Sequence, residues 1–128
     1  MLAQVLINED GINARAISQQ VSLPEFDTHV LKRVLREESN LHDPRPLTDA
    51  QIDADVDAYL EFLRERKLNH GVNIVPVVQV DRVWHIHIIQ TEQYAQVCND
   101  YFGYFLHHAS FICGMGDGKK MVPWHTRQ

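Results

Sequence analysis

One stretch of the 128-residue chain decides its fold: VNIVPVVQVDRVWHIHIIQ, residues 72–90. Its many valines and isoleucines are typical of a β-strand, although Pro76 lacks a backbone donor and disfavours a strand in the first part. In a strand, His85 and His87 would point to the same face, and both could bind one metal ion.

The same residues can also form a helix. In a helix, Asp81 and His85 are four residues apart and share a face, while a core stripe runs along Val80, Trp84 and Ile88. The pattern leaves strand and helix open, and the two structures predict different sites.

Thr48 marks the start of the most regular helix in the sequence. Thr48 and Gln51 have the spacing of a capping box, in which each side chain bonds the backbone N–H of the other residue. The apolar residues that follow recur at helical spacing: Ile52, Val56, Tyr59, Leu60 and Leu63. This helix is predicted to end at Asn69-His70-Gly71, because glycine commonly closes a helix.

An earlier helix is predicted from the same signals. Ser22 and Glu25 have capping-box spacing, so this helix is predicted to begin at Ser22 and to end near Ser39-Asn40. Before it, residues 12–21 are predicted to form a shorter helix, and residues 5–7 a short strand or a helix end.

A further helix is predicted after residue 90. Thr91 is its predicted N-cap, and apolar residues follow at intervals of three and four: Tyr94, Val97, Cys98, Tyr101 and Phe105. Gly103 is predicted to end or bend this helix, because glycine is unfavourable in a helix interior.

The composition excludes several classes of protein. The chain has the length of one domain and is 45% apolar and 23% charged, which is typical of a globular protein. It carries 12 basic and 17 acidic residues without a basic run, which argues against nucleic-acid binding. No apolar run approaches the roughly 20 residues of a membrane span. There is no signal-peptide pattern, and two cysteines make no disulfide framework, so a cytoplasmic location is predicted.

Histidine is the unusual residue, with eight in the chain and five of them after position 84. Together with their neighbours these histidines form a spaced motif over about residues 76–110: Val80-Asp81-Arg82-Val83-Trp84-His85-Ile86-His87, Thr91, Tyr94, Cys98, Phe102-Gly103 and His107-His108. The motif resembles the conserved stretch of the glycine-rich domain-containing protein-like family. In its small bacterial members the stretch has the form Val-Asp-x-x-Trp-His, Tyr, Cys, Phe-Gly and His-His.

This resemblance implies a helical domain, and it favours the helical form of residues 77–89. Two departures limit it. The long glycine-rich region of plant members is absent, and His87 stands where small bacterial members often carry an aromatic residue. The resemblance implies a domain type and supplies no reaction.

Five residues of the motif are candidate ligands of one metal ion: Asp81, His85, Cys98, His107 and His108. Carboxylate, imidazole and thiolate groups bind Zn²⁺, Fe and other first-row metals. Two antiparallel helices joined near Gln90-Thr91 would bring these residues together. Because their spacing matches none of the established metal motifs, the hypothesis is a small helical domain that binds a divalent transition metal, Zn or Fe, with its activity undefined.

Whether the domain is an enzyme stays open. Two histidines and a carboxylate could leave coordination positions for the substrate of a metal-assisted oxygenase or hydrolase. A Cys98 nucleophile is disfavoured, because an apolar helix face suppresses the thiolate. The alternative is a non-enzymatic interaction or scaffolding module, in which the Trp-His and His-His residues form a structural polar core.

The predicted fold is therefore all-α, a compact bundle of four to five helices. Residues 1–113 are predicted to form one helical domain, and residues 114–128 a glycine-rich loop and mobile C-terminal tail. The expected partner is an unspecified protein or small molecule, with neither nucleic acid nor membrane.

Overall fold

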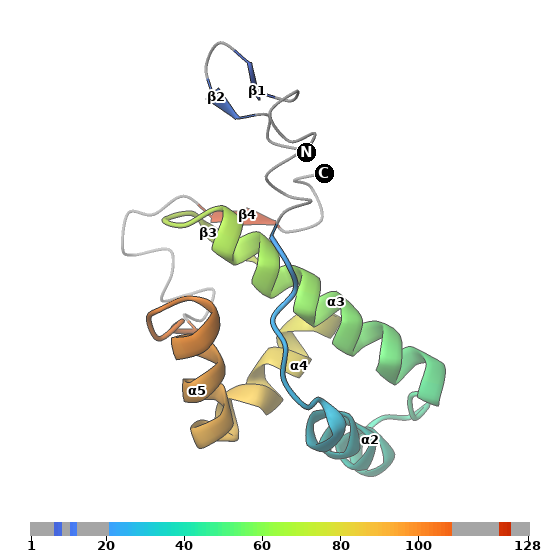
Figure 1. The fold of residues 1–128 in the computed structure, drawn as a ribbon. Helices are drawn as coiled ribbons and strands as arrows, with labels where there is room; N and C mark the ends of the chain where they lie inside the picture. The colour runs from blue at the N-terminus through green and yellow to red at the C-terminus, as the bar shows by residue number, and fades with distance from the viewer. Residues whose placement is uncertain (1–6, 9–10, 13–20, 109–120, 124–128) are drawn as a thin grey trace.

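Four helices make up most of the computed structural model, which describes residues 7–8, 11–12, 21–108 and 121–123 (Figure 1). They are listed here in chain order: α2 (His29–His42), α3 (Asp49–Leu68), α4 (Val78–Ile89) and α5 (Thr91–Tyr101). The strands are very short. β1 (Ile7–Asn8) pairs antiparallel with β2 (Gly11–Ile12), and β3 (Asn73–Val75) pairs in parallel with β4 (Met121–Pro123). The prediction of an all-α bundle is confirmed.

The stretch that decides the fold is helical from Val78 to Ile89. Although its residues favour a strand, α4 packs against α2, α3 and α5. Its buried residues lie on more than one side of the helix: Val80, Val83, Trp84, Ile86 and His87. A helix that is apolar on most sides belongs inside a bundle, and burying one large aliphatic side chain stabilises the fold by roughly 1.5–3 kcal/mol. Burial therefore outweighs strand propensity here.

The Thr48 capping box is confirmed. The Thr48 hydroxyl accepts the backbone N–H of Gln51 at 3.1 Å, and the Gln51 side chain accepts the backbone N–H of Thr48 at 2.9 Å. At its other end, α3 is followed by Gly71 at φ +90°, in the left-handed region that favours glycine. Gly103 has the same conformation, at φ +82°, just after α5.

The predicted helix start at Ser22 is wrong. α2 begins at His29, with Thr28 as its N-cap, and residues 21–28 run without helical structure across the bundle (Figure 1). We call residues 21–28 the strap. Its backbone carbonyls accept side-chain hydrogen bonds from α5: Tyr101 Oη donates to Ser22 O at 2.7 Å, and Gln93 Nε2 donates to Asp27 O at 3.1 Å. These tertiary contacts take the place of the local capping box.

α2 also extends two to three residues beyond the predicted end, to His42. Ser39 is fully buried within it, and its hydroxyl donates to Asp43 at 2.8 Å and accepts the backbone N–H of Leu47 at 2.7 Å. This polar contact fixes the turn between α2 and α3. Ser39 therefore belongs to the helix and holds the turn that follows it.

Predictions for the two ends of the chain fall mostly outside the described residues. Of the helix predicted over 12–21, Ile12 lies in β2 and Val21 in a bend, and 13–20 are not described. Residue 7, at the end of the predicted strand or helix end, lies in β1. In the predicted tail, residues 121–123 form β4, and the rest is not described. The division into 1–113 and 114–128 stays a prediction.

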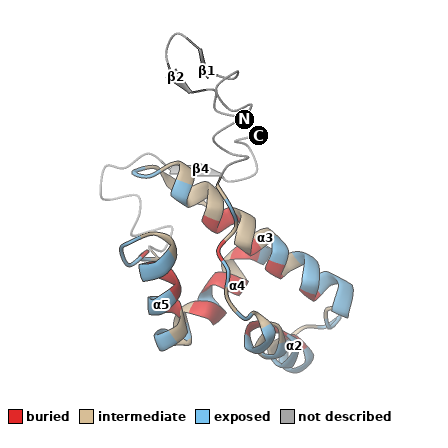
Figure 2. Cartoon of the chain, in the orientation of Figure 1, coloured by how far each residue is buried: buried red, intermediate tan, exposed pale blue. Residues whose placement is uncertain are grey.

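The core lies between the four helices. Figure 2 shows buried residues on the faces that the helices turn toward one another, with exposed residues on the outer faces. The largest fully buried side chains come from α2, α3, α5 and β3: Tyr59, Tyr94, Phe62, Leu31, Leu35, Ile52, Leu63 and Ile74. Among the described helices, none combines the length and apolar character needed to cross a membrane.

Candidate metal-binding site

Asp81 and His85 form one side of the candidate site, on the first two turns of α4. Because α4 is helical, the two residues are one turn apart on the same face, and Asp81 Oδ2 lies 3.4 Å from His85 Nε2. Their side chains are 40% and 61% exposed, so this face of α4 is open to solvent. The helical interpretation of residues 77–89 thus brings these two candidate ligands together.

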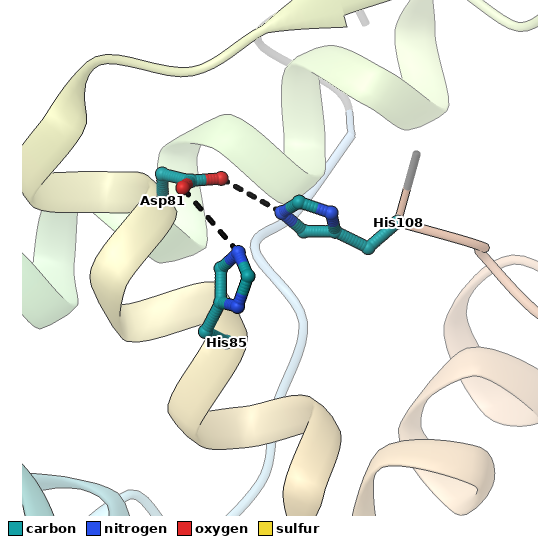
Figure 3. Close-up of side chains that lie close together, drawn as sticks. All are labelled: Asp81, His85 and His108. Atoms are coloured by element: carbon teal, nitrogen blue, oxygen red, sulfur yellow. Dashed lines mark hydrogen bonds and ion pairs between the residues drawn. The ribbon is translucent and has the colours of Figure 1, made fainter. Parts of the chain in front are cut away.

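His108 completes the site from the segment that follows α5. Its Nε2 lies 2.7 Å from Asp81 Oδ1, and its ring centroid lies 4.3 Å from that of His85. Figure 3 shows one oxygen of the Asp81 carboxylate directed at the imidazole of His85 and the other at that of His108. Only 14% of the His108 side chain is exposed. The site is therefore largely shielded from solvent at His108 and exposed to solvent at His85.

The three side chains can converge on one metal ion. One ligand atom of each lies within 4.8 Å of the other two. Around one Zn²⁺ ion, with ligand distances near 2.1 Å, two ligand atoms lie about 3.0–3.5 Å apart. Small side-chain rotations would therefore bring these atoms to ligand spacing. Three protein ligands also leave coordination positions open.

A hydrogen bond joins His108 to Asp81 within this group. An ionised carboxylate only accepts hydrogen bonds, so the 2.7 Å contact has His108 Nε2 donating to Asp81 Oδ1. A metal ion would take the place of this proton, because imidazole coordinates through an unprotonated nitrogen. A metal ion bound here would therefore compete with a proton.

A buried polar network lies directly behind His108. The Trp84 ring lies against the His108 ring, at 4.2 Å between centroids. Trp84 Nε1 donates to the hydroxyl of Tyr94 at 2.9 Å, and this hydroxyl donates to the backbone carbonyl of Leu106. The polar atoms of buried Trp84 and Tyr94 thus have partners, as buried N–H and O–H groups require.

Cys98 and His107 lie outside the group of described residues that could hold an ion. Cys98 is buried, and its sulfur accepts the backbone N–H of Leu106 at 3.4 Å. Burial raises the pKa of the Cys98 thiol, which keeps it neutral. His107 is exposed, and its ring contacts that of Phe105. The structure brings together three of the five predicted ligands.

His87 points away from the site, into the core. It is fully buried, with Nδ1 2.6 Å from the Tyr59 hydroxyl, and the Phe26 ring of the strap stacks on it at 4.7 Å. Burial lowers the pKa of His87 to about 4, against a smaller opposing effect of the Gln93 side chain. This buried role of His87 was not predicted from the sequence. The signal was its spacing, four residues after buried Val83 and three after buried Trp84.

Arg82 joins α4 to the end of α2, beside Asp81. Its guanidinium donates to Glu38 at 2.9 Å and to both oxygens of Asp43, at 2.9 and 3.2 Å. The hydrogen bonds from Arg82 and from Ser39 lower the pKa of Asp43. This link orients the first turns of α4, and the sequence alone gave no indication of it.

Comparison with known proteins corrects the family assignment. The resemblance to the glycine-rich domain-containing protein-like family is wrong, because the family model that matches this chain is UCP032817-like, over residues 17–116. The quoted motif consists of widely spaced single residues, several of which have packing roles: Trp84, Tyr94 and Cys98. Such residues suit many helix pairs and do not define a family.

No curated protein and no solved structure matches the chain. The UCP032817-like match covers most of the chain, including all three residues of the candidate site. That family is uncharacterised and supplies no reaction. On this match, the chain is a member of the UCP032817-like family.

Proposed function

We propose that this protein binds one divalent transition metal ion, Zn²⁺ or Fe²⁺, through Asp81, His85 and His108. The observation that carries the proposal is the Asp81 carboxylate, which has one imidazole Nε2 at 2.7 Å and another at 3.4 Å. Two histidines and one carboxylate form a common ligand set for non-haem Fe²⁺ and for catalytic Zn²⁺.

The exposure of the group supports a binding role over a purely structural one. A polar network that only specifies packing is expected to be buried and fully satisfied. The network of Trp84 and Tyr94 fits that description, since both residues are buried. The Asp81 and His85 side chains instead keep 40% and 61% of their surface exposed, which leaves room for an ion and a further ligand.

The open coordination positions suit a small molecule. In a metal-assisted hydrolase or oxygenase, such positions would receive water or substrate, and the ion would polarise it. The residues define no substrate, so the proposal stops at metal binding with open positions.

A reducing, cytoplasmic setting suits the protein, because the buried Cys98 is a free thiol.

A second candidate is an interaction or scaffolding module in which these residues have structural roles. It is favoured by the buried Trp84–Tyr94 contact and by the placement of the Cys98 sulfur on Leu106. On this alternative, replacing His85 or His108 lowers stability and leaves metal binding unchanged. Metal binding therefore separates the two candidates.

The test is a calorimetric titration of metal-free protein, purified without a histidine tag, with Zn²⁺. We expect one ion per chain, and loss of this binding in His108→Ala and in Asp81→Asn. His107→Ala is the matched control, because His107 is the neighbouring histidine and lies outside the group. Binding that is absent from the wild-type protein, or that His107→Ala abolishes, would contradict the proposal.

A further inference from the structure

His108 has no helix to orient it. α5 ends at Tyr101, and Gly103 redirects the chain at φ +82°, so the segment that carries His108 needs other contacts to fix its place. The two ligands on α4 are positioned by the helix itself. The position of His108 therefore depends on what fixes the segment after α5.

Leu106 is the fixed point of this segment, because both of its backbone polar groups are bonded to buried side chains. Its N–H donates to Cys98 Sγ at 3.4 Å, and its carbonyl accepts the Tyr94 hydroxyl at 2.5 Å. Its own side chain is buried, with 5% exposed. Two residues of chain span at most about 7 Å, so anchoring Leu106 confines His108 to a small region.

Trp84 connects this anchor to the site. Its indole N–H donates to the same Tyr94 hydroxyl at 2.9 Å, while its ring lies against the His108 imidazole. Tyr94 therefore holds the segment through Leu106, and Trp84 links Tyr94 to the ring of His108. Burial raises the pKa of the Tyr94 hydroxyl far above its ordinary value, so this donor stays protonated.

We propose that Tyr94 and Cys98 are positioning residues for the metal site: by holding the backbone of Leu106 they place His108 opposite Asp81. This inference rests on the proposed function and gives a role to Cys98, which the sequence suggested as a ligand. Partners that orient metal ligands commonly contribute 10–100-fold to metal affinity. Tyr94 and Cys98 would act in the same way through the backbone.

The test compares two tyrosines that make the same kind of hydrogen bond. Tyr94→Phe removes the hydroxyl that donates to the Leu106 carbonyl. Tyr101→Phe removes the hydroxyl that donates to the carbonyl of Ser22 in the strap, a hydrogen bond of 2.7 Å. We expect Tyr94→Phe to weaken Zn²⁺ binding at least tenfold and Tyr101→Phe to change it less than about twofold. Equal effects of the two variants on Zn²⁺ affinity would overturn the inference.

A second pair of variants covers the case in which Tyr94→Phe does not fold. Cys98→Ala removes the acceptor for Leu106 N–H, whereas Cys98→Ser keeps an acceptor there. Cys98→Ser should bind Zn²⁺ more tightly than Cys98→Ala, with circular dichroism showing that both are folded. Equal affinities of these two folded variants would contradict the inference.

The inference can also fail separately from the proposed function. In the metal-free protein, NMR should show magnetisation transfer between the Trp84 indole and the His108 imidazole, whose rings are in contact. This signal should persist in Tyr101→Phe and weaken in Tyr94→Phe. If the wild-type protein binds no Zn²⁺, the metal proposal fails, and the NMR signal still tests whether Tyr94 positions His108. An unchanged signal in folded Tyr94→Phe would overturn the positioning inference.

Discussion

Nε2 of His108 lies 2.7 Å from Oδ1 of Asp81, although the two residues are 27 positions apart in the chain. One residue belongs to α4 and the other follows α5, so the contact exists only because the helices pack as they do. His85 joins them through the helical spacing of α4. The site is thus a property of the folded protein.

Metal binding is expected to weaken as the pH falls. His85 and His108 must each present an unprotonated nitrogen to the ion, so protons compete with the metal. We expect Zn²⁺ affinity to fall at least about tenfold between pH 7.5 and pH 5.5. Calorimetry at both pH values, in buffers of different ionisation enthalpy, measures the affinity and the protons released.

Bound metal is expected to stabilise the folded protein. An ion that binds only the folded state, at a free concentration 100 times its dissociation constant, adds about 2.7 kcal/mol. Thermal unfolding with and without Zn²⁺ should show a rise in Tm for the wild type and for His107→Ala. A rise of the same size in His108→Ala would indicate binding elsewhere on the protein.

Alanine substitutions at the helix starts are expected to lower stability by different amounts. Thr48→Ala removes the hydroxyl that accepts the Gln51 N–H and should lower the free energy of unfolding by about 1 kcal/mol. The predicted N-caps Thr91 and Ser22 are wrong, because the structure has Gln90 and Thr28 in these positions. In Thr91→Ala and Ser22→Ala the loss should therefore stay below about 0.5 kcal/mol. Urea denaturation of the three variants gives the comparison, and an equal loss at all three positions would contradict it.

Buried His87 predicts that stability decreases in acid. Its pKa is about 4 in the folded protein, while in the unfolded chain it is about 6.5. Above pH 6.5 both states are neutral and the stability is complete. Between pH 6.5 and 4 only the unfolded state takes up the proton, so up to roughly 3 kcal/mol is lost.

Denaturation midpoints at several pH values between 7 and 4 measure this loss. His87→Gln cannot take up the proton, so its stability should depend less steeply on pH over this range, even if it is lower throughout. The exposed His29 provides the control, as His29→Gln should keep the wild-type slope. An unchanged slope in His87→Gln would show that other groups cause the acid sensitivity.

Local signals in the sequence predicted α3 well and α2 less well. At Thr48 both bonds of the capping box form, as the local spacing predicts. At Ser22 the same spacing is present, but Tyr101 takes the Ser22 carbonyl and Phe26 stacks on His87. A capping pattern cannot reveal such contacts, because they involve residues more than 60 positions away in the chain.

The candidate site was only partly predictable for a similar reason. Once α4 is helical, the spacing of Asp81 and His85 places them together. In the sequence, His107 and His108 are equivalent candidates for the third ligand. The anchoring of Leu106 determines which of them reaches Asp81 and His85, and the sequence does not show this anchoring. Cys98, a predicted ligand, is buried on the apolar face of α5, where its sulfur accepts the backbone N–H of Leu106, and it lies outside the group of described residues that could hold an ion.

The most direct test of the account is to observe the imidazole nitrogens while Zn²⁺ is added to the metal-free protein. In ¹⁵N NMR spectra of the histidine rings, we expect Nε2 of His85 and of His108 to shift together and to stop shifting at one equivalent. The rings of His87 and His107 should keep their positions. If neither His85 nor His108 responds, or if His107 responds in their place, the proposed site does not exist.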